Sequence, residues 1–124
     1  MPVKELTKAE EQIMQILWQL QEAIVKDILD HMPNPKPAYN TVSTVVRVLE
    51  GKGFIDHNAY GNSHVYFSLV AETDYKQFTF DKMMKNYFNN SYESLVSFIA
   101  NEKKLDINEL DELSAVLENL KTKR

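Results

Sequence analysis

Short hydrogen-bonding side chains and one guanidinium share an arc of the helix that the sequence predicts for residues 38–52. This polar arc consists of Asn40, Ser43, Thr44 and Arg47. The opposite arc is apolar and consists of Val42, Val45, Val46 and Leu49. At 100° per residue, the apolar arc would pack on a core and leave the polar arc outside. Amide, hydroxyl and guanidinium groups pair with base edges and phosphates, so we predict that this helix enters a DNA major groove. The alternative is a solvated helix face.

Three residues beside this arc are also predicted to contact DNA. Tyr39 and Thr41 lie at the start of the helix, and Tyr39 is interpreted as a contact to the DNA backbone. A small hydrophobic anchor is the alternative for Tyr39. Lys52 follows the helix, where its charge would either meet a phosphate or complement the helix dipole.

The segments 54–60 and 64–69 have the pattern of two strands joined by a turn at residues 61–63. Val65, Phe67 and Leu69 alternate with polar residues, which predicts that they form the buried face of the second strand. Helix, tight turn and hairpin in this order indicate a recognition helix followed by a wing. An ordinary hairpin tip is the alternative. The predicted minor-groove or phosphate contacts are Asn58, Tyr60, Asn62, Ser63 and His64, with the last three preferred.

The residues before the predicted recognition helix would position it. Thr7 and Glu10 have the spacing of a capping box, which predicts a helix from there to about residue 20. Residues 22–25 are predicted to be extended, and residues 26–32 to form a second helix. Prolines at positions 33, 35 and 37 exclude helix from the connection that follows. Trp18 is interpreted as a core residue that packs the first helix on the third.

The second half of the chain is predicted to be entirely helical. We place the domain boundary between residues 71 and 72, with helices at about 73–89, 91–103 and 106–121, the last opened by a capping box of Asp106 and Glu109. Three short apolar helices make a poor independent domain, so residues 72–124 are predicted to pair with their copy in a twofold homodimer. The predicted dimerisation residues are Tyr87, Phe88, Leu95, Phe98, Ile99, Leu110, Leu113, Leu117 and Leu120.

Composition excludes several classes of protein. The 124 residues contain no cysteine, so disulfides and thiolate metal sites are excluded. No apolar window is long enough for a membrane span and no signal pattern is present, which predicts a cytoplasmic protein without membrane insertion. The formal net charge of −4 argues against indiscriminate coating of nucleic acid. Binding to DNA should therefore be a focused, salt-dependent contact.

No catalytic, cofactor or metal site is predicted. The chain has no glycine-rich phosphate loop, no supported catalytic triad and no carboxylate pair in an evident cleft. Asp27 and His31 have a spacing that suits a metal, and His57 and His64 could meet across the hairpin. A solvated helix face and ordinary surface histidines are the preferred interpretations.

Three segments resemble the BlaI/MecI penicillinase-repressor family, which is sometimes grouped with CopY. They are Leu6–Trp18 (LTKAEEQIMQILW), Thr41–Leu49 (TVSTVVRVL) with KGFI at 52–55, and SLV at 94–96 with NE at 101–102. The resemblance covers nearly the whole chain and implies a homodimeric winged-helix repressor of a palindromic operator. It also implies release by proteolysis within the dimerisation region, triggered by a membrane-anchored sensor.

The chain departs from the family pattern at several positions. Val48 stands where many members have a basic residue, and Asn62 where they often have Arg or Lys, which implies fewer phosphate contacts. The scissile Asn-Phe pair of the family aligns with Phe98-Ile99, which is a different chemical signature. Copper-responsive relatives end in a cysteine cluster, which this chain lacks.

The sequence therefore predicts a mainly α protein with a small β-hairpin wing. A winged helix-turn-helix domain would be followed by an all-α dimerisation region. The predicted function is repression of transcription by a homodimer on double-stranded DNA. Two alternatives remain: a winged-helix module for protein–protein interaction, and a regulator that binds a small molecule among the Tyr, Phe and Met residues of 75–99.

Overall fold

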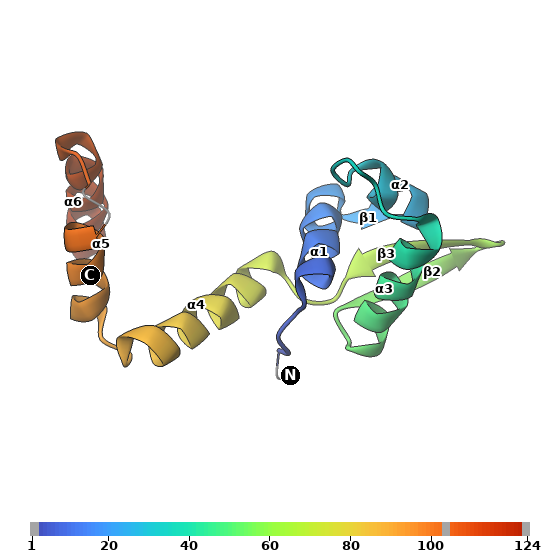
Figure 1. Ribbon diagram of the computed structural model, residues 1–124, viewed down its shortest axis with the longest axis horizontal. Coiled ribbons are helices and arrows are strands. Elements are labelled where there is room, and N and C mark those ends of the chain that lie inside the picture. Colours follow the sequence, from blue (N-terminus) through green and yellow to red (C-terminus); the bar gives the residue numbers. More distant parts are fainter. Residues whose placement is uncertain (1–2, 103–104, 123–124) are drawn as a thin grey trace. The chain divides into compact units, whose positions relative to one another are not determined.

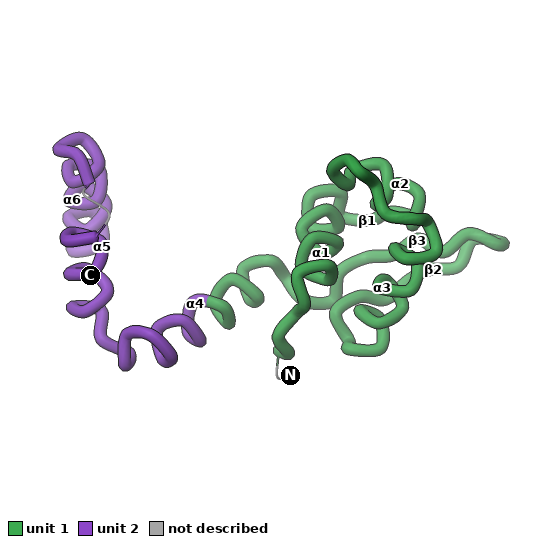
Figure 2. The backbone as a smooth tube through the Cα atoms, viewed as in Figure 1, with its two compact units in different colours: residues 1–79 green, residues 80–124 purple. Residues whose placement is uncertain are grey.

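The protein is described here by a computed structural model that covers residues 3–102 and 105–122. It contains six helices and three short strands in these residues (Figure 1). The chain divides into two compact units, residues 1–79 and 80–124 (Figure 2). The division falls inside α4 (Glu72–Phe88), whereas the predicted functional boundary at 71/72 coincides with the start of that helix. That functional boundary stays a prediction.

Three helices of the N-terminal unit form where the sequence predicted them. They are α1 (Lys8–Leu20), α2 (Val25–Asp30) and α3 (Tyr39–Gly51). The capping box of α1 is confirmed, because the Glu10 backbone N–H donates to Thr7 Oγ1 and the Thr7 N–H donates to Glu10 Oε1. The α2 helix ends two residues earlier than predicted, since the His31 N–H turns back to the Ile28 carbonyl.

A three-stranded antiparallel sheet completes this unit. Its strands β1 (Glu22–Ala23), β2 (Ile55–Tyr60) and β3 (Ser63–Ser68) lie in the order β1-β3-β2. Tyr60 pairs with Ser63, so the wing turn contains only Gly61 and Asn62, one residue fewer than predicted. Gly61 has φ 62°, the left-handed conformation required at the first position of such a two-residue turn.

The predicted buried face of β3 was wrong. Tyr66 is the buried residue of the strand, whereas Leu69 is 55% exposed and Val65 and Phe67 are half-buried. The buried face of β3 is the one on which α1 packs. The Trp18 indole N–H of α1 donates to Ser68 Oγ, and Ser68 lies on the same side of the strand as Tyr66. Apolar alternation alone favoured the other side because it takes no account of where the helices pack.

The core of the N-terminal unit joins the helices to the sheet. Its most buried side chains are Ile13, Met14, Leu17, Ile28, Val42, Val46, Leu49, Phe54 and Ile55. Trp18 is half-buried and packs against this core, and its predicted contact with α3 stays a prediction. Its indole N–H also donates to the Val70 carbonyl, and its ring lies 6.1 Å from that of Tyr75. Trp18 therefore joins α1 to the end of the sheet and the start of α4.

The C-terminal unit contains the end of α4, α5 (Tyr92–Glu102) and α6 (Ile107–Thr122). Asn89 and Asn90 have φ of 50° and 58°, and these left-handed residues end α4. Ring contacts between Phe80 and Tyr92 and between Phe88 and Phe98 join α4 to α5. The predicted capping box at Asp106 is confirmed. The predicted end of the middle helix at residue 103 lies outside the described residues.

Within the described residues, every helix falls short of the length and hydropathy that a membrane span requires.

Candidate nucleic-acid interface

The two arcs of α3 have the burial that the sequence predicted. Val42, Val46 and Leu49 are at most 1% exposed and fix the helix on the core. The polar arc remains accessible: Asn40, Thr44 and Arg47 are exposed, and Ser43 is half-buried. Val45, the fourth residue of the predicted apolar arc, is half-buried. Because the apolar arc packs on the core, α3 presents its polar arc on the surface of the unit.

Hydrogen bonds along the helix order this polar arc. Arg47 Nη2 donates to Ser43 Oγ at 3.3 Å, one helical turn earlier. Thr44 Oγ1 donates to the Asn40 carbonyl at 2.9 Å. Asn40 and Arg47, two helical turns apart, lie along one side of α3. Such groups match the acceptors and donors on base edges.

Three elements surround a concavity of about 450 Å³ next to this polar arc. Its walls come from the start of α2, from α3 and from the wing turn. Six of the predicted DNA-contacting residues line it, namely Tyr39, Ser43, Arg47, Asn62, Ser63 and His64. The fold therefore brings the two predicted groups of contacts, which are separated in the sequence, to one place. Asn40 and Thr44 lie along α3 outside this lining.

Two predicted contacts are placed differently. Thr41 is exposed and borders a second, apolar cavity of about 230 Å³ that is lined by Pro33, Pro35 and Pro37. Lys52 Nζ lies 2.7 Å from Glu10 Oε1, a buried carboxylate of α1. Lys52 thus has an internal partner in this structure, and its predicted phosphate contact stays a prediction.

Lys26 and Tyr66 also line the concavity, and the sequence did not single them out. Lys26 is the second residue of α2 and adds a cation to the wall. Burial, and then the negative charge of Glu50, raise the pKa of Tyr66, against a smaller opposing effect of Arg47. The Tyr66 hydroxyl can both donate and accept a hydrogen bond. Only the packing of α2 beside the wing could have identified these two residues.

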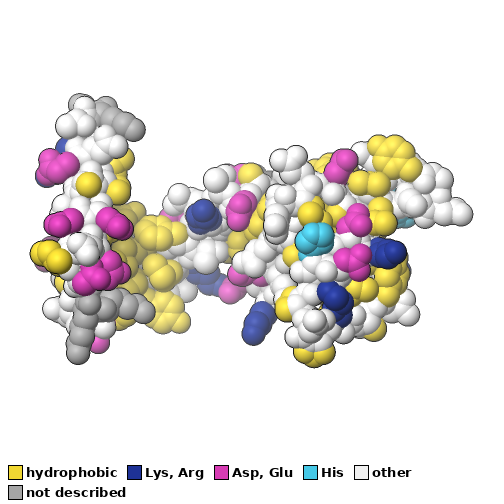
Figure 3. All heavy atoms as spheres, turned by 90° about the horizontal axis from the view of Figure 1, so that it is seen from above, with side chains coloured by type: hydrophobic (Ala, Val, Ile, Leu, Met, Phe, Trp, Pro, Cys, Tyr) yellow, Lys and Arg dark blue, Asp and Glu magenta, His cyan; other side chains and the backbone are white. Residues whose placement is uncertain are grey.

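The charged side chains on the surface of the N-terminal unit suit a contact with DNA that is confined to a small area. The face of the N-terminal unit seen in Figure 3 mixes basic with acidic side chains and carries no extended basic surface. The cations that line the concavity are Arg47 and Lys26.

The histidine pairs considered in the sequence have different surroundings. His31 Nδ1 lies 2.8 Å from the backbone carbonyl of Asp27, so the ring contacts the backbone of that residue. His57 and His64 do approach each other across the hairpin, where their rings stack with centroids 4.2 Å apart.

Comparison with known proteins identifies the family. A family model described as penicillinase repressor matches residues 6–119. The chain belongs to the penicillinase repressor family. Family membership confirms the resemblance seen in the sequence and places the chain among transcriptional repressors rather than enzymes.

Two proteins of the penicillinase repressor family are similar to this chain over nearly their whole length. The methicillin resistance regulatory protein MecI of Staphylococcus aureus is 29% identical over 114 residues, which cover 91% of this chain and 93% of MecI. The penicillinase repressor of Bacillus licheniformis is 23% identical over 124 residues, covering 98% of this chain and 96% of that protein.

A solved structure supports the fold. The solution structure of the monomeric form of Bacillus licheniformis BlaI, in complex with the blaP half-operator, matches with a TM-score of 0.51 and 21% identity. The match covers 60% of this chain and 92% of the BlaI chain. The winged-helix fold predicted from the sequence is thereby confirmed.

Proposed function

We propose that this member of the penicillinase repressor family represses transcription by binding a palindromic operator as a homodimer. The observation that carries the proposal is the concavity between α3 and the wing, where Ser43 and Arg47 of α3 converge with His64 of β3. A solved BlaI chain of the same fold is in complex with half-operator DNA, which supports the same use of the fold here. A protein that binds chromosomal operators would act in the cytoplasm.

The row of polar side chains on α3 would enter the major groove. In this arrangement Arg47 pairs with a guanine or a phosphate, Asn40 pairs with an adenine, and Thr44 contacts a phosphate or a thymine methyl. Ser43 holds the guanidinium of Arg47 through their hydrogen bond. Tyr39 and Thr41, at the start of the helix, would contact the DNA backbone.

The wing would contact DNA beside the recognition helix. Asn62, Ser63 and His64 lie at its turn, next to Arg47 around the same concavity. A phosphate or the edge of the minor groove would meet these groups while α3 occupies the major groove. Asn62 is neutral, so the wing offers hydrogen bonds rather than charge at its turn. Lys26 would supply the cation on the opposite wall.

Dimerisation would use the C-terminal unit. In α5 and α6 the described residues include no buried side chain. Leu110, Leu113, Leu117 and Leu120 are 43–58% exposed and recur at three- and four-residue steps along α6. A second copy would bury this apolar row, which water otherwise contacts. Other predicted dimer residues are accessible too: Tyr87 is 80% and Phe98 44% exposed, while Phe88, Leu95 and Ile99 are half-buried.

Release from the operator would follow loss of the dimer, since one subunit makes only half of the contacts. Phe98 and Ile99 lie inside α5, and cleavage between them would separate α6 from the DNA-binding unit. A membrane-anchored sensor or a protease would be the partner for this step.

The test is fluorescence anisotropy on duplexes from upstream of the chain's own gene, with a scrambled duplex as control, from low to physiological salt. We expect Arg47→Ala to weaken specific binding by about 1–3 kcal/mol and to weaken binding to the scrambled duplex less, because the scrambled duplex loses only the charge of Arg47 and not a base contact. Arg47→Lys is the matched variant, because it keeps the charge but loses the bidentate fork. Equal affinity of wild type for both duplexes at every salt concentration would contradict the proposal for that site.

A further inference from the structure

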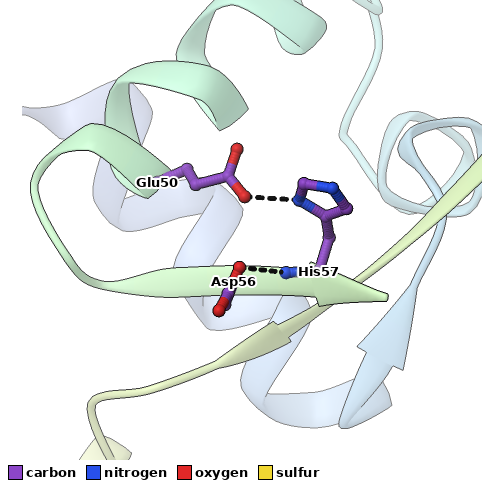
Figure 4. Close-up of side chains that lie close together, drawn as sticks. All are labelled: Glu50, Asp56 and His57. Carbon is purple, nitrogen blue, oxygen red and sulfur yellow. Dashed lines mark hydrogen bonds and ion pairs between the residues drawn. The ribbon is translucent and has the colours of Figure 1, made fainter. Parts of the chain in front are cut away.

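Three potential metal ligands lie together where α3 passes into the wing (Figure 4). Glu50 is in the last turn of α3, and Asp56 and His57 are near the start of β2. Each offers one donor atom, a carboxylate oxygen or an imidazole nitrogen, and these atoms all lie within 4.8 Å of one another. None of the three lines the concavity next to α3, although the His57 ring stacks on His64, which does line it.

The tertiary structure holds these donors in place. His57 Nδ1 lies 2.5 Å from Glu50 Oε2, and the His57 backbone N–H donates to Asp56 Oδ1 at 2.8 Å. The His64 ring stacks on a face of the His57 imidazole, with the ring centroids 4.2 Å apart and an angle of 12° between the planes. The side chains of His57 and Glu50 are 28% and 29% exposed. The imidazole is therefore oriented by its neighbours and remains within reach of an ion from solvent.

We propose that Glu50, Asp56 and His57 bind a divalent first-row transition-metal ion, with Zn²⁺ as the reference ion. One imidazole nitrogen and two carboxylate oxygens form a mixed ligand set that suits Zn²⁺. Ca²⁺ and Mg²⁺ prefer oxygen ligands throughout, and Cu⁺ prefers sulfur. Water would complete the coordination, as it does at zinc sites with three protein ligands.

Binding would replace a proton by a metal ion. In the structure His57 Nδ1 and Glu50 Oε2 share a hydrogen bond. The ion would take the place of that proton on Nδ1, the neutral imidazole would carry its one proton on Nε2 instead, and the donor atoms would move to about 2.0–2.2 Å from the ion.

The ion would link the recognition helix to the wing. Its ligands come from α3 and β2, so the complete site exists only in the folded protein. An ion that binds only the folded state raises its melting temperature. The site would thus restrain the wing relative to α3 without a contact to DNA.

The first measurement is calorimetric titration of the full-length chain, free of any affinity tag, with ZnCl₂. We expect one ion per chain, a higher melting temperature with Zn²⁺, and visible absorption bands when Co²⁺ replaces Zn²⁺. Glu50→Gln and His57→Ala should each weaken binding by about 10- to 100-fold, the range known even for outer partners of metal ligands. None of these readouts involves DNA, so their failure leaves the proposed repressor function untouched.

His31→Ala is the matched control, because it removes another surface histidine that has a nearby aspartate. It should bind Zn²⁺ like the wild type. Asp56→Asn is a second test variant that leaves the Glu50–His57 pair intact, and circular dichroism in chelator checks that each variant folds. The proposal is overturned if the wild type takes up no stoichiometric ion, or if the cluster variants bind as tightly as the wild type. Loss of binding in His31→Ala would overturn it as well.

Discussion

Glu10 is buried in the N-terminal unit, with 4% of its surface exposed, and two neighbours satisfy its carboxylate. The Thr7 backbone N–H and Lys52 Nζ donate to Oε1 at 2.8 and 2.7 Å. Burial acts to raise the pKa of Glu10, but the hydrogen bond and charge of Lys52 and the bond from Thr7 outweigh it and lower the pKa. A single carboxylate thus caps α1 and attaches it to the end of α3.

Replacing Lys52 by Met should destabilise the fold at neutral pH by about 1–3 kcal/mol, because a buried charged acceptor loses a donor. Since the folded pKa of Glu10 is lowered, its stabilising effect is present above the unfolded pKa and is lost as the pH falls through the folded pKa. The difference between the two proteins should therefore shrink in acid. Urea unfolding across that pH range measures it.

Lys52→Arg is the control for this prediction, because it keeps the charge and should retain most of the stability. A Lys52→Met variant as stable as wild type at neutral pH would contradict the structural role of the ion pair.

At the scale of elements, the wing depends on a backbone conformation that few residues adopt. Gly61 begins the two-residue turn with φ 62°, and no heavy atom lies within 4 Å of a Cβ built there. The space is open, so backbone strain is the only obstacle to a side chain. Gly51, at the end of α3, also has open space around a Cβ but no positive φ.

Gly61→Ala should therefore destabilise the protein by about 1–2 kcal/mol, the cost of a left-handed L-residue. Gly51→Ala should instead stabilise it by about 0.5–1 kcal/mol, because alanine favours a helix. Thermal unfolding of both variants measures the two changes. Equal shifts of the same sign would contradict the assignment of strain to the turn.

At the scale of the whole molecule, the C-terminal unit leaves much apolar surface in contact with water. The face seen in Figure 3 has acidic side chains bordered by hydrophobic ones. Leu117 of α6 is 58% exposed, and no described residue of this helix is buried. A monomer with such a surface would be marginal, and the proposed second copy would cover it.

Leu117→Glu should convert the protein from dimer to monomer, because a charge would have to be buried in the interface. Ala115→Glu adds the same charge on the opposite side of α6 and should leave the dimer intact. Sedimentation equilibrium over a range of concentrations distinguishes the two. A dimer of unchanged stability in Leu117→Glu would place the interface elsewhere.

The spacing of residues close together in the sequence was sufficient to predict much of the secondary structure. Thr7 with Glu10, and Asp106 with Glu109, mark helix starts by spacing alone, and both boxes are present in the structure. The valines of α3 indicated its buried arc because helical periodicity is a property of neighbours in the chain. The buried face of β3 was assigned wrongly, because it depends on which helix packs against the sheet.

The amino-acid sequence by itself determined the order of helices and strands, the two arcs of α3 and the family, since these depend on short-range spacing and on residue identity. Only the tertiary structure decided which distant side chains meet. It paired Lys52 with Glu10, added Lys26 and Tyr66 to the concavity, and assembled the cluster at Glu50. The physical reason is that these contacts result from packing between elements, which no local pattern encodes.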